Sequence, residues 1–369
     1  MFNKRWAIGA LVVLVAAVVL AACSPEVVTE TVEVEVTRVV TETVEVEGET
    51  VEVTVVETVV EEVEVVVEVT AEPEEEPSAP KDLIVCMAQE PQTLYTYGNS
   101  MLAQRAVQHA FEENNFETKS YGYQARGIEK IPSLADGDAV INVVEVAAGD
   151  TVVDAAGEVV VLEDGMMITN SDGENVEFAG SAMMEQMVVD FTMKARVWSD
   201  GVAVTASDSV YSFNVAADPD TPSSKFTTDR TASYEANGDL GLVWTGVPGY
   251  LDSTYFTNIW QPLPEHHLGG FSAAELLEAE ESSRTPIGDG PYKIDEWVAG
   301  DSIVLSPNEF YYEGAVPLNS VTYKFIPDTN QLIAQLLSGS CDIGTQDGMG
   351  ADQSPFLIEA ESSGLLTPY

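Results

Sequence analysis

Hydrophobic and polar positions follow three different patterns along the chain. An unbroken apolar run covers Ala7–Leu20. Residues 24–80 alternate valine with glutamate and threonine, which is the period of a β-strand, although no turn residues define hairpins there. From Lys81 onward, short apolar runs and helical stripes are separated by glycine and proline. The pattern therefore predicts a leader, a low-complexity segment and a globular part.

The globular part begins with a predicted strand, a loop and a helix. Residues 83–87 form a continuous apolar run, which is typical of a buried strand. Asn99 and Ser100 offer N-cap chemistry for the helix. Ligands are often bound at such a unit, because the first N–H groups of a helix are unpaired. The helical residues expected to face the core are Leu102, Ala103, Ala106, Val107, Ala110 and Phe111.

Residues 136–195 are predicted to be rich in β-structure. Two apolar runs, 158–162 and 166–168, flank Glu163–Gly165 and predict a hairpin. Residues 171–173 predict another turn.

Helices and strands alternate further along the chain. Thr205 and Asp208 form a capping-box pattern for a helix that is expected to end near Asp218. Two glycines and two prolines in residues 286–291 predict a tight, fixed backbone. The remaining predicted elements are strands from Tyr292, at 302–305 and at 321–326, a helix from Asp328 to Gly339, and a strand entered at Cys341–Gly344. The fold class is α/β with a mixed sheet and a β-rich insertion.

The chain is strongly acidic. Its 369 residues include 15 Lys+Arg and 62 Asp+Glu, so the formal net charge is −47. This balance argues against nucleic acid as a partner and against docking on an anionic membrane through side chains, because both require clustered cations. We interpret the acidity as favouring solubility at a cell surface, with attraction of cationic ligands as the alternative.

The first 23 residues have the organisation of an export signal. Lys4 and Arg5 precede the apolar run, and Leu20-Ala21-Ala22-Cys23 ends it. Small residues before a cysteine resemble the lipobox of bacterial lipoproteins, which implies cleavage before Cys23 and lipidation of its sulfur. An uncleaved membrane anchor is the rival interpretation, but the apolar run is short for a span.

Residues 24–80 are interpreted as a stalk between the anchor and the globular part. The proline- and glutamate-rich stretch 72–80 is typical of an extended linker. A β-rich segment that drives oligomerisation is the alternative.

Several segments of the globular part resemble one receptor family. They are Trp198–Gly201 with Thr205–Asp208, Pro286–Tyr292, Asn308 with Tyr311–Tyr312, and Leu336–Gly339 leading into Asp342–Ile343. In this order they are similar to family 5 extracytoplasmic solute-binding proteins of ABC transporters, the peptide- and nickel-binding type. One departure is Asp289, where the family usually has threonine; it adds negative charge to the turn.

The resemblance implies a periplasmic-binding-protein-like (type II) lobe. Family members are two-lobed clamps that close on a solute without catalysis and present it to the permease subunits of an ABC importer. Because the family's chain normally continues, residues 81–369 are expected to be the N-terminal part of this domain, with the second lobe largely missing.

The expected ligand is a peptide, with nickel chelates, opines and oligosaccharides as alternatives within the family. The expected location is extracytoplasmic, with the lipid on Cys23 holding the protein to the outer face of the cytoplasmic membrane. A tethered structural or adhesive surface protein is the alternative from another class.

The resemblance also indicates candidate site residues. Loops that face the ligand in the family correspond to Tyr97, Gly98, Asn99 and Ser100, to Lys225 and Phe226, and to Thr345 and Gln346. Each could instead belong to an ordinary surface loop. A disulfide between Cys86 and Cys341 is implied, because the family's fold places their strands side by side; two free buried thiols are the alternative.

Catalytic and metal-binding patterns are absent from the sequence. No G-x-S-x-G, Walker or H-E-x-x-H motif occurs, and abundant carboxylates make any single pair uninformative. His109 is interpreted as a helix boundary residue. His266 and His267 are adjacent, and adjacent residues rarely bind one ion without further ligands. We therefore expect no enzymatic activity, no metal and no cofactor.

Overall fold

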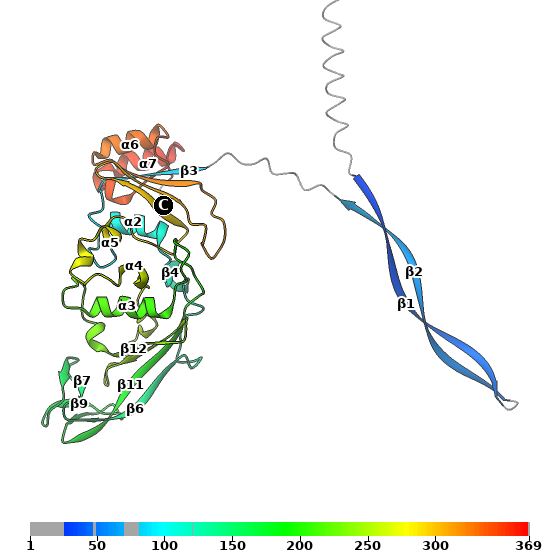
Figure 1. The fold of residues 1–369 in the computed structure, drawn as a ribbon, viewed down its shortest axis with the longest axis horizontal. Helices are drawn as coiled ribbons and strands as arrows, with labels where there is room; N and C mark the ends of the chain where they lie inside the picture. The colour runs from blue at the N-terminus through cyan, green and yellow to red at the C-terminus, as the bar shows by residue number, and fades with distance from the viewer. Residues whose placement is uncertain (1–25, 47–48, 70–80, 120, 368–369) are drawn as a thin grey trace, which may run out of the picture. The chain divides into compact units, whose positions relative to one another are not determined.

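The computed structural model describes residues 26–46, 49–69, 81–119 and 121–367 (Figure 1). The leader 1–23, with the predicted lipidation site Cys23, lies outside these residues. The chain divides into two compact units, Met1–Ala79 and Pro80–Tyr369. No helix in the described ranges has both the length and the apolar character needed to cross a membrane.

The first unit contains one long antiparallel hairpin. β1 (Glu26–Val46) pairs with β2 (Glu49–Val69) along the whole length of both strands. The alternation of valine with threonine and glutamate therefore forms strands, and these strands pair although the sequence offered no clear hairpin signal.

The second unit contains a five-stranded sheet that is partly parallel. Its order is β14 (Tyr292–Val298), β15 (Ser302–Pro307), β16 (Ser320–Phe325), β3 (Asp82–Met87) and β17 (Ile343–Gly344). β15 is antiparallel to its neighbours β14 and β16, whereas β3 runs parallel to both β16 and β17. Helix α2 (Leu102–Phe111) packs against this sheet through Ala103, Val107 and Phe111.

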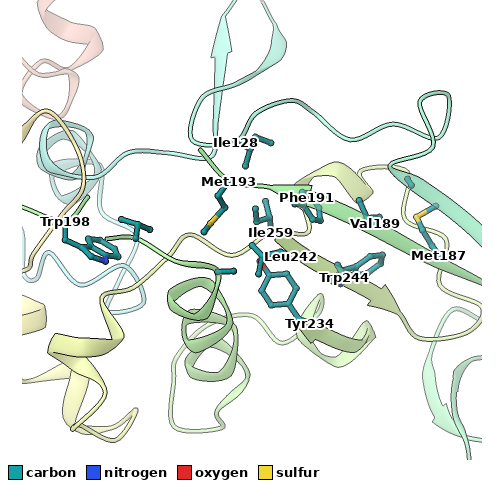
Figure 2. Close-up of a cluster of buried hydrophobic side chains, with 13 residues drawn as sticks. Ile128, Met187, Val189, Phe191, Met193, Trp198, Tyr234, Leu242, Trp244 and Ile259 are labelled. Carbon is teal, nitrogen blue, oxygen red and sulfur yellow. The ribbon is translucent and has the colours of Figure 1, made fainter. Parts of the chain in front are cut away.

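A second sheet of four antiparallel strands forms the other main core. Its order is β12 (Thr231–Asn237), β13 (Gly241–Gly246), β11 (Ser181–Thr192) and β6 (Ala139–Ala147). Helix α3 (Ala206–Ala217) packs against it. Figure 2 shows the buried cluster, in which Phe191, Leu242 and Trp244 of the sheet meet Ile128 and Ile259 from loops.

The β-rich insertion has a different pairing from the one predicted. β7 (Thr151–Val153) pairs with β8 (Val159–Val161), and β9 (Met167–Thr169) pairs with β10 (Asn175–Glu177). The hairpin predicted across Glu163–Gly165 is therefore wrong, because the strands on either side of this turn belong to separate ribbons. Both ribbons bury apolar side chains in one small core: Val152, Leu162, Ile168 and Phe178.

The remaining elements are short. A hairpin is formed by β4 (Phe116–Lys119) and β5 (Gly122–Ala125), and the other α-helices are α4 (Glu265–Leu268), α5 (Glu280–Ser283), α6 (Thr329–Leu337) and α7 (Ser354–Ser362). Single 3-10 turns lie at Thr228–Arg230, Tyr255–Thr257, Glu275–Leu277, Gln346–Gly348 and Ala351–Gln353.

The two predicted helix caps have different outcomes. The capping box at the start of α3 is confirmed, since the Thr205 N–H donates to the Asp208 carboxylate at 2.8 Å. The predicted cap of α2 is wrong. The N-cap residue is Met101, whose side chain makes no cap hydrogen bond, and Asn99 Oδ1 accepts from the N–H of Met101 rather than from an N–H of the helix. Leu102 is consequently 64% exposed at the first helical position rather than in the core.

Candidate ligand-binding site

The carboxyl ends of the parallel strands place three loops at one edge of the five-stranded sheet. The Ile326 N–H donates to the Met87 carbonyl, and the Thr345 N–H donates to the Cys86 carbonyl, so both bonds continue the pairing past the strands. Ligands of open α/β sheets bind at this edge. The loop after β3 carries four of the predicted contacts, Tyr97 to Ser100.

Helix α2 holds the loop after β3 in place. Gln108 Nε2 donates to the Leu94 carbonyl and Gln104 Nε2 donates to the Tyr95 carbonyl. The Gly98 N–H closes a turn onto the same Tyr95 oxygen. A Cβ at Gly98 would lie 2.5 Å from Thr93 Cγ2, so this turn requires glycine. The loop is therefore built as a fixed surface.

Within this loop, Tyr97 and Asn99 contact the protein itself. The Tyr97 hydroxyl lies 2.8 Å from the Ser212 hydroxyl on α3, and burial raises the pKa of Tyr97 to about 12. Asn99 Nδ2 donates to Gln92 Oε1. Ser100 is exposed. The tyrosine thus stays neutral and anchors the loop to α3.

Lys225 has a structural role in this fold. Its Nζ donates to the carbonyl oxygens of Ala216, Asp218 and Thr221, at 2.5, 2.6 and 3.1 Å. These carbonyls lie at and just beyond the C-terminal end of α3, where cations are favoured by the helix dipole. The ammonium is therefore occupied, which argues against its predicted role in ligand contact.

Phe226 remains accessible. The residue is 56% exposed, and the guanidinium carbon of Arg230 lies 3.9 Å from the centroid of the Phe226 ring. Residues on either side of Phe226 lie close to Tyr97 of the loop after β3, because they line the same cavity of about 230 Å³. Its lining includes Ser223, Ser224, Thr227, Thr228 and Trp260.

The last predicted pair follows β17 at the same edge of the sheet but does not line this cavity. The Thr345 hydroxyl bonds Asp347 and the Cys86 carbonyl. Gln346 lines a separate, mostly apolar cavity of about 380 Å³ between α6, β17 and α7. Of the predicted contact residues, Tyr97 thus lines one cavity together with neighbours of Lys225 and Phe226, and Gln346 lines another.

Cys86 and Cys341 form a disulfide. Their Cα atoms are 5.9 Å apart, and the bond links β3 to the turn that enters β17. Both cysteines are buried together with Ile326 and Leu332. The bond therefore holds the two strands whose ends carry the first and third loops.

A buried ion pair joins the two sheets and was not identified from the sequence. Arg196 Nη1 lies 2.6 Å from Asp289 Oδ2, and both side chains are almost completely buried. Asp289 Oδ1 also accepts from the Glu113 N–H. The negative charge expected at Asp289 is therefore neutralised by Arg196. The sequence carries no signal for this pair, because Arg196 and Asp289 are 93 positions apart.

The glycines around Asp289 allow this contact. A Cβ at Gly288 would lie 1.9 Å from the Phe111 carbonyl oxygen, and the Gly290 N–H donates to that same oxygen. The tight backbone predicted for residues 286–291 is explained by this close approach to the end of α2.

A small polar cavity of about 170 Å³ opens beside the same end of α2. It is lined by Thr96, Asn99, Arg105, Gln108, His109, Glu112, Asn114 and Gln261. Glu112 has one hydrogen-bond donor within the described residues, the Thr96 hydroxyl at 3.2 Å. Burial raises the pKa of Glu112 to about 8, and the negative charge of Asp289 raises it further, against the opposing effects of Thr96 and Arg105.

Two of the three histidines have hydrogen-bond partners, whereas His267 Nε2 is buried and has none in the described part of the chain. His109 is hydrogen-bonded to Asn114, and His266 Nε2 lies 2.7 Å from Asp200 Oδ2. Across the described part of the chain, no group of three or more potential ligand side chains is placed to hold a metal ion.

Comparison with known proteins assigns the fold. Residues 186–362 match the model of bacterial extracellular solute-binding proteins, family 5. The matched segment is the middle part of that family's proteins and covers just under half of this chain, so the chain is similar to this family. The oligopeptide-binding protein AppA of Bacillus subtilis is 37% identical over 144 residues, which are 38% of this chain and 26% of AppA. An OppA of Lactococcus lactis is 26% identical over 202 residues, covering 47% and 33% of the two chains.

Solved structures agree with the sequence matches. AppA from Bacillus subtilis in complex with a nonapeptide superposes with a TM-score of 0.52 at 25% identity, covering 71% of this chain and 44% of that chain. An oligopeptide-binding protein from Thermus thermophilus gives a TM-score of 0.51 at 17% identity, covering 70% and 43%. The periplasmic-binding-protein-like α/β fold is confirmed, and the chain spans less than half the length of these relatives.

Proposed function

We propose that this protein is a lipid-anchored solute-binding protein that captures peptides and delivers them to the permease of an ABC importer. The observation that carries the proposal is the superposition on AppA, whose structure holds a nonapeptide. The fixed loop after β3 and its cavity beside α3 supply a preformed surface for one side of a ligand. Residues 81–369 form the solute-binding part in this proposal, and 24–80 form the stalk.

Capture of peptides can be tested by ligand-dependent stability. The full chain is heated with defined peptides of three to nine residues, with the corresponding free amino acids as the control. A peptide at 100 times its dissociation constant should stabilise the protein by about 2.7 kcal/mol. If every peptide leaves the melting temperature unchanged, peptide capture by this chain is excluded.

Anchoring needs a separate test. Expression in a bacterial host with labelled palmitate should label the protein and place it in the membrane fraction. The Cys23→Ser variant should lose the label. Labelling of that variant at the wild-type level would contradict lipidation at Cys23.

A further inference from the structure

The polar cavity beside α2 contains a carboxyl group that forms no ion pair within the described residues. Glu112 lines the cavity, and Thr96 is its hydrogen-bond donor at 3.2 Å. Arg105 lies on α2, one turn and a half before the end of the helix, and its charge lowers the pKa of this carboxyl. The two residues form no ion pair within the described residues. The neighbouring Asp289 carboxylate forms an ion pair with Arg196. Glu112 is therefore the acidic group in this region that has no cationic partner.

The amide side chains of the cavity add hydrogen-bond acceptors. Gln108 Nε2 donates to the Leu94 carbonyl, and Gln261 Nε2 donates to the Glu113 carbonyl. These bonds fix the orientation of both amides, because only the nitrogen can donate to a backbone oxygen. Their Oε1 atoms have no hydrogen-bond donor in the part of the chain that the structure describes. The cavity thus offers one carboxyl group and two amide oxygens to a donor from outside.

We propose that this cavity binds the primary ammonium group of a small ligand, with Glu112 as the counter-ion and the Gln108 and Gln261 oxygens as further acceptors. An ammonium has three N–H donors and no acceptor, which matches these three groups. The volume of about 170 Å³ admits the ammonium and a short carbon chain. The inference adds a chemical group of the ligand to the proposed function. It rests on the proposed function for the kind of molecule that carries this ammonium.

The ionic state of Glu112 gives the proposal a specific signature. The charged groups around it are Arg105 and His109 on α2, Asp289 with its partner Arg196, and Glu113 with its partner Arg126. At pH 6.5 a carboxyl with a pKa of about 8 is protonated. An ammonium that pairs with the carboxylate must therefore displace this proton, and binding should release about one proton per ligand.

The experiment is calorimetry of the full chain with n-butylammonium and with glycinamide, each at pH 6.5 in two buffers of different ionisation enthalpy. Tetramethylammonium at equal ionic strength is the control, because it carries the charge without N–H donors. We expect saturable binding with proton release for at least one amine. Butylammonium stands for a lysine-like side chain and glycinamide for a peptide N-terminus, so their relative affinities identify the source.

Variants separate the cavity from general attraction to an acidic protein. Glu112→Gln should weaken amine binding at least tenfold and abolish proton release, whereas Glu163→Gln, on an exposed turn, should change neither. Arg105→Gln should tighten binding, since it removes a competing cation. Equal binding of tetramethylammonium, absence of proton release, or unchanged binding by Glu112→Gln would each overturn the proposal. Amine binding without peptide binding would overturn the peptide proposal and leave this site intact.

Discussion

Two neighbouring regions at the C-terminal end of α2 each contain a carboxyl group, and their surroundings differ. In the junction between the sheets, Asp289 pairs with Arg196 at 2.6 Å and accepts the Glu113 N–H. In the polar cavity, Glu112 has the Thr96 hydroxyl as its donor. Burial raises the pKa of Asp289, but the Arg196 guanidinium, which remains charged at any ordinary pH, and the Glu113 N–H both favour the anion. The second carboxyl is held as a neutral acid at pH 7, since burial raises the pKa of Glu112 to about 8.

This difference separates an acid that maintains the fold from one that is available to a ligand. Charges removed from water are tolerated when a partner is supplied within the fold. Asp289 has that partner, and its removal should affect stability. Glu112 has no cationic partner among the residues that the structure describes, and its removal should affect binding and the pH dependence of stability.

The largest expected effect comes from breaking the buried pair. Arg196→Met removes the guanidinium and leaves Asp289 as an uncompensated buried acid, which typically costs about 3–5 kcal/mol. Urea unfolding of the full chain, followed by tryptophan fluorescence, measures the loss. Lys130→Met serves as the control, because its ion pair with Asp138 is partly exposed, with 57% of the lysine side chain accessible, and should contribute less than the fully buried pair. Equal midpoints for both variants would show that the junction does not depend on the pair.

Removing both partners should restore much of that stability. In the double variant Arg196→Met with Asp289→Leu, no unpaired charge remains, and such replacements are often close to neutral. The double variant should therefore be more stable than Arg196→Met by about 2 kcal/mol or more. If the two single losses simply add, the pair is not coupled and the contrast with Glu112 is lost.

An acid that is neutral in the folded protein makes the free energy of unfolding fall as the pH rises, whereas a paired acid makes it rise. Because the pKa of Glu112 is about 8 in the folded protein and near 4.3 in the unfolded chain, the folded state binds the extra proton between these values. The contribution of Glu112 is therefore fully present below about pH 4.3 and is lost as the pH rises to about 8. Glu112→Gln removes this dependence.

The measurement is the difference in unfolding free energy between wild type and Glu112→Gln at several pH values. The variant should gain on the wild type by up to a few kcal/mol between pH 5 and pH 8. Other titrating groups cancel in the difference. A difference that stays constant over this range would mean that Glu112 titrates normally and that its environment is not desolvated.

The sequence predicted elements that depend on local chemistry and missed contacts between distant segments. The capping box of Thr205 and Asp208 involves residues three positions apart, so its pattern is visible in the sequence. Arg196 and Asp289 are 93 positions apart, and the loop that brings them together depends on the approach of Gly288 to Phe111. The hairpin at Glu163–Gly165 was mispredicted because both adjoining strands pair with other strands instead.

The candidate site shows the same division. Position in the family located the loop 97–100, and helix α2 does support it. Position in the family also indicated Lys225 as a ligand contact, since it lies in the segment that follows helix α3. Its actual partners are three backbone carbonyls, whose positions follow from where α3 ends. Glu112 was missed, since one more glutamate among 62 acidic residues carries no signal in sequence.

Lys225 provides the smallest test and extends the comparison to a positive charge. If its ammonium stabilises the carbonyl groups at the end of α3, Lys225→Met should lower the free energy of unfolding by about 1 kcal/mol. Hydrogen bonds and helix-dipole contacts at a helix terminus contribute on this scale. Lys225→Arg should retain part of this, since its charge remains. Neither variant should change amine binding at Glu112, which lies in a different cavity. A methionine variant that keeps full stability but loses peptide binding would instead return Lys225 to the ligand site, and would show that the helix end does not require it.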